Sequence, residues 1–175
     1  MADARRDEIV RAARALLEAE GPSGLSMRRI AAKLGIQAPS IYKHVPGKNE
    51  LEAAIIADGL SDLGAALAQM GPDATDLGRA YRAFALAHPH LYRLITDQPL
   101  PRHLLPAGLE ERSAAPLLAV LPDEALARSA WAAAHGLASL ELADRFPPDA
   151  DLDAAWAAMS DAFAAAASRL DMPQD

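Results

Sequence analysis

The sequence predicts an all-α protein of about nine helices. Alanine, leucine and arginine, which favour helices, are abundant, whereas alternating runs of Val, Ile, Thr and aromatic residues, which favour strands, are absent. Apolar residues recur every three to four positions, as on one face of a helix. Pairs such as Gly21-Pro22 and Pro147-Pro148 interrupt this pattern and indicate where helices end.

The N-terminal part of the chain predicts two helices joined by a tight turn. The first helix is expected over residues 4–20 and ends at Gly21. Ser26 can cap a second helix over 27–34, and Gly35 can take the left-handed conformation that closes it. The side chains expected to face inward are Ile9, Ala13, Leu16, Leu17, Ile30, Ala31 and Leu34.

A third helix is expected over residues 37–44, followed by a long fourth helix over 48–70. Pro39 is tolerated because it lies in the first turn, where its missing N–H has no intrahelical partner. Ile41 and Val45 should point back to the core of the first two helices. The apolar side of the fourth helix is expected to consist of Leu51, Ile55, Leu63 and Leu67.

The remainder of the chain predicts five further helices. Residues 97–106 contain three prolines and are expected to form a loop. Pro147-Pro148 should end the helix expected over 123–145. The helices are expected over 75–87, 89–95, 108–120, 123–145 and 151–170.

The charge is distributed unevenly along the chain. Residues 1–50 hold 9 Lys and Arg against 6 Asp and Glu, a net charge of +3, whereas residues 51–175 hold 8 against 18, a net charge of −10. A basic segment on an acidic body favours phosphate at the basic segment, although +3 over fifty residues is also ordinary for a protein surface. The absence of cysteine excludes a disulfide framework and a zinc finger, and fits a cytoplasmic protein. No apolar run approaches the ~18 residues of a membrane span, so we expect no membrane partner.

The segment GLSMRRIAAKLGIQAPSIYKHVPGK, residues 24–48, has the layout of a helix-turn-helix whose second helix enters the DNA major groove. On this interpretation Gln37 presents its amide to a base edge, and Ala38 and Pro39 contact a thymine methyl group. Lys43 can pair with phosphate or with a guanine edge. The remaining side chains are expected to contact phosphate: Arg28, Ser40, Tyr42, His44 and Lys48. Each signal alone is weak, because a lone Tyr or His on a helix is usually structural and a basic helix face is usually only solvated.

Three stretches of the N-terminal part of the chain, IVRAARALLEAEG, GLSMRRIAAKLGI and APSIYKHVPGKNEL, resemble the DNA-binding domain of the tetracycline-repressor (TetR) family. Tyr42, His44 and Lys48 stand in register with that family's pattern, and the chain departs from it at Lys43 and at Val45, where many members have phenylalanine. The resemblance covers about residues 5–60. It implies a helix-turn-helix DNA-binding domain at 1–47 and a helical effector-binding and dimerisation domain at 48–175.

The segments HPHLYRLI, 88–95, and AWAAAHGLASLELADRF, 130–146, resemble one TetR branch, the Trp/His-Gly (WHG) type. Small residues on the predicted helix 123–145 and an apolar stripe on 151–170 could form a four-helix interface between two subunits, or could simply be intrachain core. The residues expected at the dimer interface are Ala130, Leu137, Trp156, Met159 and Phe163.

Aromatic and histidine side chains of the C-terminal part are candidates for a small-molecule pocket. Aromatic residues at helical spacing are nevertheless more often core than pocket. Two imidazoles in His88-Pro-His90, with no carboxylate or thiol cluster nearby in sequence, are poor evidence for a metal, so we expect neither metal nor cofactor. The candidate pocket residues are Tyr81, Phe84, His88, Tyr92, Trp131 and His135.

These patterns together predict a DNA-binding transcriptional regulator. The form implied by the resemblance is a ligand-responsive repressor that binds a palindromic operator as a homodimer and is released by a small molecule. The alternative is a helical interaction or ligand-carrier protein without sequence-specific DNA binding. We do not expect an enzyme, because the sequence contains no carboxylate pair, Ser-His-Asp arrangement or phosphate-binding loop that would indicate catalysis.

Overall fold

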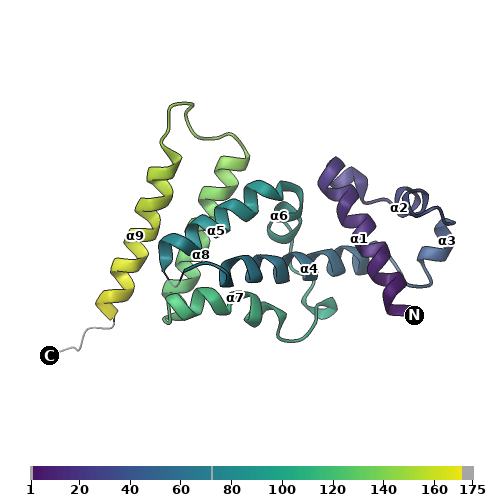
Figure 1. Ribbon diagram of the computed structural model, residues 1–175, viewed down its shortest axis with the longest axis horizontal. Coiled ribbons are helices and arrows are strands. Elements are labelled where there is room, and N and C mark those ends of the chain that lie inside the picture. Colours follow the sequence, from purple (N-terminus) through teal and green to yellow (C-terminus); the bar gives the residue numbers. More distant parts are fainter. Residues whose placement is uncertain (1, 72, 171–175) are drawn as a thin grey trace. The chain divides into compact units, whose positions relative to one another are not determined.

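The computed structural model describes residues 2–71 and 73–170, and this part of the chain contains nine α-helices, two short 3₁₀ helices and no strand (Figure 1). The predicted all-α fold is therefore confirmed. The α-helices are α1 Ala2–Glu20, α2 Met27–Leu34, α3 Ala38–Ile41, α4 Lys48–Ala68, α5 Ala74–Ala87, α6 Pro89–Thr96, α7 Leu109–Val120, α8 Glu124–Leu142 and α9 Leu152–Leu170. The 3₁₀ helices are Gly21–Gly24 and Arg102–Leu104, and the second of these lies in the stretch predicted to be a loop.

The third helix is shorter than predicted, because regular α-helix ends at Ile41 instead of residue 44. The backbone N–H groups of His44 and Val45 both donate to the Ile41 carbonyl at 2.9 Å, so the chain closes into a turn. Pro46 disfavours helical geometry at the residue before it, and it cannot itself donate to continue the helix.

One of the two predicted caps of α2 is confirmed and the other makes no capping bond. Gly35 has φ 65° and ψ 29°, which confirms the left-handed C-cap of α2. Ser26 occupies the N-cap position with extended backbone, but its side chain makes no capping hydrogen bond. Helix α8 ends at Leu142 instead of residue 145, and Asp144 takes a positive φ of 52° just beyond it. Asp123 does cap α8, since its carboxylate accepts from the Leu126 N–H at 2.7 Å.

The described residues form two compact units, and each combines segments distant in sequence. The first unit contains the chain up to Ser61 together with His88–Leu109, and the second contains Asp62–Ala87 together with the chain from Glu110 onward. Helix α6 therefore belongs to the same unit as the helix-turn-helix. The division into functional domains at residues 47 and 48 stays a prediction.

The core of the first unit is built from the apolar faces predicted for its helices. Fully or almost fully buried side chains come from α1, α2, the α3 turn, α4 and α6, and only Leu34 among the predicted inward residues of α2 is half-buried. Truncating such a side chain to alanine typically costs about 2–5 kcal/mol of stability. These side chains are Ile9, Ala13, Leu17, Ile30, Ile41, Val45, Leu51, Ile55, Leu91 and Tyr92.

In the second unit α5 packs against both α8 and α9, which also pack against each other (Figure 1). The approach of α5 to α9 depends on Gly78, where an added Cβ would lie 2.7 Å from Ser160 Oγ. Small residues line the buried side of α8, so neighbouring helices approach it closely. The buried residues of this unit include Leu77, Tyr81, Phe84, Ala127, Ala130, Ala134, Ala138 and Trp156.

Candidate nucleic-acid interface and the polar cluster of the C-terminal unit

The turn between α2 and α3 has the geometry of a helix-turn-helix. Gly35 donates its N–H to the Ala32 carbonyl at 3.2 Å, and Ile36 donates to the Ala31 carbonyl at 3.0 Å, which closes α2. Gln37 then takes extended backbone angles, φ −80° and ψ 138°, and α3 begins at Ala38. The two helices are thus separated by three residues, Gly35 to Gln37.

Helix α3 and the turn after it have one buried and one exposed side. Ile41 and Val45 are 0% and 2% exposed and join Ile30 in the core, as predicted. Between them Tyr42 is 51% exposed, although burying its ring would be favourable in a monomeric protein. The buried side anchors this segment to α2 and leaves its opposite side free to meet a partner.

The residues predicted to contact DNA all keep solvent access. Arg28, Gln37, Pro39, Tyr42, Lys43 and Lys48 are exposed, and Ala38, Ser40 and His44 are half-buried. Within the described residues Arg28 and Lys43 have no carboxylate partner, and Lys48 pairs with Glu52 at 3.3 Å. An exposed pair of this kind contributes about 0–1 kcal/mol, so phosphate can replace Glu52 at little cost.

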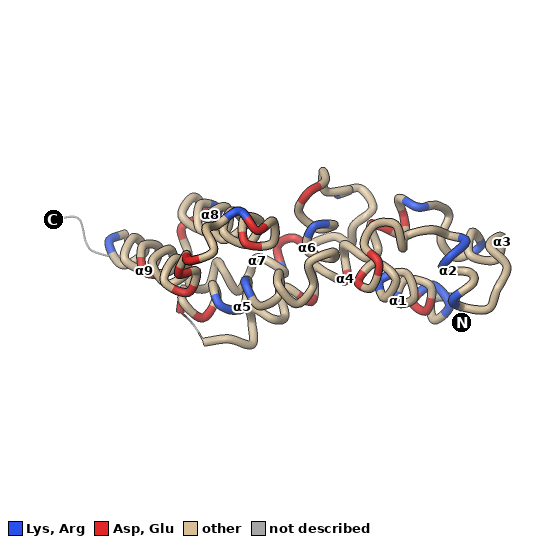
Figure 2. Tube along the Cα trace, turned by 90° about the horizontal axis from the view of Figure 1, so that it is seen from above, with Lys and Arg blue, Asp and Glu red and all other residues tan. Residues whose placement is uncertain are grey.

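Lys and Arg gather along α1 and α2 and beside α3 (Figure 2). Arg29 is not equivalent to its neighbour Arg28, because its guanidinium forms an ion pair with Glu20 at the end of α1. This pair ties α2 to α1, and no local pattern distinguishes the two arginines. The arrangement presents cations and hydroxyls around an exposed short helix, which suits contacts to phosphate and to base edges.

Comparison with known proteins supports the same interpretation. A family model described as bacterial regulatory proteins, tetR family, matches residues 9–55, and one described as tetracyclin repressor-like, C-terminal domain, matches residues 74–163. The chain belongs to the TetR family. The HTH-type transcriptional regulator Rv0681 of Mycobacterium tuberculosis is 31% identical to it over 88% of this chain and 77% of that protein.

Two further relatives agree with this membership. The transcriptional repressor DrrR1 of Streptomyces coeruleorubidus is 56% identical over 45 residues, which are 26% of this chain and 17% of the repressor. A crystal structure of a TetR-family transcriptional regulator from Streptomyces coelicolor superposes with a TM-score of 0.68 at 22% identity, covering 99% of this chain and 91% of that one. The fold is therefore that of a TetR-family regulator, and the protein is a DNA-binding transcriptional regulator. Its assignment to the WHG branch stays a prediction.

The candidate pocket residues of this TetR-family chain fall in different environments. Tyr81, Phe84 and Tyr92 are buried, Trp131 is 53% exposed, and His135 is half-buried with its Nδ1 3.4 Å from Ser139 Oγ. Tyr92, like His88, belongs to the first unit and the other four to the second, so the six do not form one cluster within a unit. Their role in ligand binding stays a prediction.

His88 has a specific partner that the sequence did not reveal. Its Nδ1 lies 2.9 Å from Glu18 Oε1, on a helix 70 residues earlier in the chain. Both side chains are partly accessible to solvent. Sequence spacing carries no information about this pair, because only the packing of α6 beside α1 brings the two side chains together.

Some candidate dimer residues are buried within the single chain, and the others are partly exposed. Ala130 and Trp156 are 7% and 5% exposed within a single chain, so most of their surface is already covered by intrachain neighbours. Phe163 is half-buried against the cluster of Leu121, Ala127 and Ala130. Leu137 and Met159 are also half-buried.

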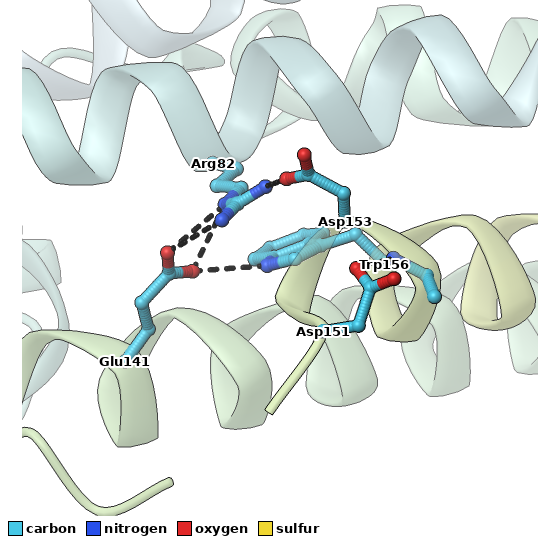
Figure 3. Close-up of polar contacts among 6 residues, drawn as sticks. Arg82, Glu141, Asp151, Asp153 and Trp156 are labelled. Atoms are coloured by element: carbon cyan, nitrogen blue, oxygen red, sulfur yellow. Dashed lines mark hydrogen bonds and ion pairs between the residues drawn. The ribbon is translucent and has the colours of Figure 1, made fainter. Parts of the chain in front are cut away.

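A polar cluster joins α5, α8 and α9 near the end of α8 and the start of α9 (Figure 3). The Arg82 guanidinium donates to both oxygens of Glu141, with the shortest distance 2.7 Å, and to Asp153. The Trp156 indole N–H donates to Glu141 at 3.0 Å, and the guanidinium carbon lies 6.0 Å from the Trp156 ring centroid. The hydrogen bonds to Glu141, with those to Asp153, raise the pKa of Arg82 above its ordinary value, against the opposing effect of burial.

This Arg82 cluster was missed at the sequence level. The apolar stripe of helix 151–170 explains Trp156 as a core residue, but it does not explain why the Trp156 N–H and Glu141 meet between α8 and α9. The only available signal was Glu141 itself, a charged residue on the otherwise small and apolar face of α8. A charged residue in such a position needs a partner, because an unpaired buried carboxylate is costly.

No helix within 2–71 and 73–170 is both long enough and apolar enough to cross a membrane.

Proposed function

We propose that this TetR-family regulator binds a palindromic operator as a homodimer and is released from it by a small molecule. The observation that carries the proposal is the two-sided α3 segment, in which Ile41 is fully buried and the adjacent Tyr42 is half exposed. A recognition helix needs such a split, because one side must be fixed to the supporting helix while the other meets the groove. Repression with ligand release is what the family resemblance implies.

The DNA-contact roles follow from chemistry and exposure. Gln37 stands at the start of α3 and offers both a donor and an acceptor to a base edge, and Ala38 and Pro39 provide apolar contact to a thymine methyl. Arg28 and Lys48 lie at the starts of α2 and α4, where a cation and free backbone N–H groups suit phosphate. Ser40, Tyr42, Lys43 and His44 complete the predicted contacts.

Exposed small residues on α8 and α9 support the homodimer. The solvent side of α9 is rich in alanine and that of α8 includes several small residues, which let helix backbones approach closely. An added Cβ at Gly136 of α8 would meet nothing within 4 Å. Large apolar side chains, Trp131 at 53% and Leu140 at 44% exposure, accompany them. The exposed small residues include Ala125, Ser129, Ala132, Ala154, Ala158, Ala162 and Ala165.

A dimer explains how the operator is read. Two α3 helices can enter successive major grooves if they stand one helical turn apart, roughly 34–36 Å. A ligand bound by the residues predicted for the pocket would then act by changing this separation, and α4 is the continuous helix whose residues are divided between the two units. Since ligand and DNA would share one coupling free energy, DNA must weaken ligand binding as much as ligand weakens DNA binding. The regulator would act where chromosomal DNA lies, in the bacterial cytoplasm.

Selection of bound fragments from random duplex DNA, followed by sequencing, tests the proposal. We expect an enriched palindrome whose half-sites are one helical turn apart, and a dimer mass by light scattering. A variant carrying Arg28→Ala, Tyr42→Phe and Lys48→Ala should lose this binding while keeping its helical circular dichroism. Absence of any enriched motif at low salt would favour the alternative, a helical interaction or carrier protein that does not read DNA.

A further inference from the structure

Helix α6 begins with two imidazoles that both meet the end of α1. His88 occupies the N-cap position of α6, and its Nδ1 lies 2.9 Å from Glu18 Oε1. The ring of His90 lies against Gly21, the residue directly after α1. All four residues belong to the first compact unit, so this contact lies inside the unit that carries the helix-turn-helix.

Gly21 is suited to this contact in two ways. Its φ of 70° is a conformation that glycine adopts without strain, and an added Cβ would lie 3.2 Å from His90 Cε1. The turn after α1 therefore combines a left-handed backbone with close approach of the His90 ring. A side chain at residue 21 would require both the backbone and the imidazole to shift.

Helix α6 is also held against α4. An added Cβ at Gly59 of α4 would lie 2.7 Å from Ile95 Cδ1 and 3.0 Å from Leu91 Cδ1. Leu91 is fully buried and Tyr92 is 1% exposed. Helix α6 is thus closely packed on α4 and joined to α1 by the polar contact of His88 with Glu18.

The last turn of α1 carries two carboxylates and no cation, although the negative end of a helix disfavours carboxylates. Each carboxylate has a cationic or imidazole partner: Glu18 meets His88 of α6, and Glu20 forms an ion pair with Arg29 of α2. The same turn of α1 is therefore tied to α6 on one side and to the supporting helix of the helix-turn-helix on the other. Arg29 is adjacent to Arg28, a predicted phosphate contact.

We propose that His88 is a positioning residue for DNA binding. Together with Glu18 it fixes α6 to the last turn of α1. The last turn of α1 then holds α2, and through α2 the recognition helix, in place. The inference rests on the operator binding proposed above. Helix α6 then acts as part of the DNA-binding head, and its docking on α1 contributes to operator affinity without touching DNA.

The test measures operator affinity and amide hydrogen exchange of the full-length chain, with the palindrome obtained by selection as the probe. The variants are His88→Ala, Glu18→Ala, the double variant, and Glu18→Gln, which keeps a hydrogen-bond acceptor for the imidazole. Glu124→Gln is the control, because it removes a carboxylate from a more exposed ion pair, to Arg128, within α8 of the other unit. All measurements are made well below the unfolding transition of each variant.

We expect each alanine variant to weaken operator binding by roughly two- to five-fold, the range for loss of one partly exposed hydrogen bond. The double variant should bind the operator no more weakly than the single variant with the larger loss, because both substitutions remove the same contact. Glu18→Gln should recover part of the affinity and Glu124→Gln should bind normally. In the parent chain, DNA should slow exchange of α6 amides between Leu91 and Thr96, and this protection should diminish in His88→Ala.

Additive losses in the double variant, or unchanged affinity and unchanged α6 protection in the alanine variants, would overturn the positioning role and leave operator binding intact. Failure of the parent chain to bind any selected DNA would overturn the operator-binding function, and the inference with it. A loss of affinity matched by Glu124→Gln would show a general charge effect and would also overturn the positioning role.

Discussion

Replacing Arg82 by alanine removes the guanidinium that joins α5 to Glu141 of α8 and to Asp153 of α9. The side chains of Arg82 and Glu141 are 22% and 12% exposed, whereas that of Asp153 is 89% exposed. After the substitution Glu141 keeps only the Trp156 N–H as a partner in this cluster. A largely buried carboxylate is then left without its counter-charge.

The size of the effect follows from these exposures. Loss of a hydrogen bond to a charged group costs about 1.5–3 kcal/mol, and removing one partner of a fully buried ion pair costs about 3–5 kcal/mol. Because Arg82 retains some solvent access, we expect the lower part of the combined range, about 2–3 kcal/mol of unfolding free energy. The contact with Asp153 adds little, since exposed pairs contribute about 0–1 kcal/mol.

Urea unfolding followed by circular dichroism, at one fixed protein concentration, measures this cost. Arg128→Ala is the control, because Arg128 and its partner Glu124 are 72% and 69% exposed. It should change stability by no more than about 0.5 kcal/mol. Asp153→Asn should resemble this control, and Glu141→Leu combined with Arg82→Met should recover much of the loss by replacing the pair with apolar groups.

An Arg82→Ala variant no less stable than Arg128→Ala would refute the reasoning. It would mean that water reaches Glu141 freely enough to replace the guanidinium. A loss in Asp153→Asn as large as that in Arg82→Ala would likewise contradict the assignment of the stabilisation to Glu141.

Three further predictions concern the DNA-binding head. Lys48→Ala should weaken binding to all DNA sequences about equally and reduce the slope of log affinity against log salt by about one, as measured by fluorescence anisotropy between 50 and 200 mM salt; a sequence-dependent loss would argue for base contact instead. Gln37→Ala should cost roughly 1–3 kcal/mol on the selected operator and relax preference at one base pair, whereas a uniform loss would make Gln37 a positioning residue. Gly35→Ala should lower the free energy of unfolding by about 1–2 kcal/mol through backbone strain alone, because an added Cβ there meets nothing within 4 Å. Gly35→Asn should cost less when both variants are compared by thermal melting, because asparagine tolerates the left-handed conformation better. Equal costs would contradict strain as the cause.

Local regularities allowed most of the helices to be predicted. The 3–4 spacing of Ile9, Ala13 and Leu17 depends only on helix geometry, and their burial follows from it. Gly35 closed α2 as expected, since its requirement for a left-handed backbone is also local. Two local predictions were inaccurate. Helix α3 ends earlier than predicted, shortly before Pro46, and Ser26 stands at the N-cap of α2 without a side-chain capping hydrogen bond.

The sequence by itself determined the all-α class, most of the buried faces of α1, α2 and α4, and the helix-turn-helix with its exposed Tyr42, because these depend on residues within one or two turns of each other. Only the tertiary structure decided which polar groups meet across long separations: Glu18 with His88 over 70 residues, and Arg82 with Glu141 over 59. The physical reason is that a charged side chain specifies the need for a partner but not its position in the chain. That position is settled by how the apolar faces of α1, α6, α5 and α8 pack.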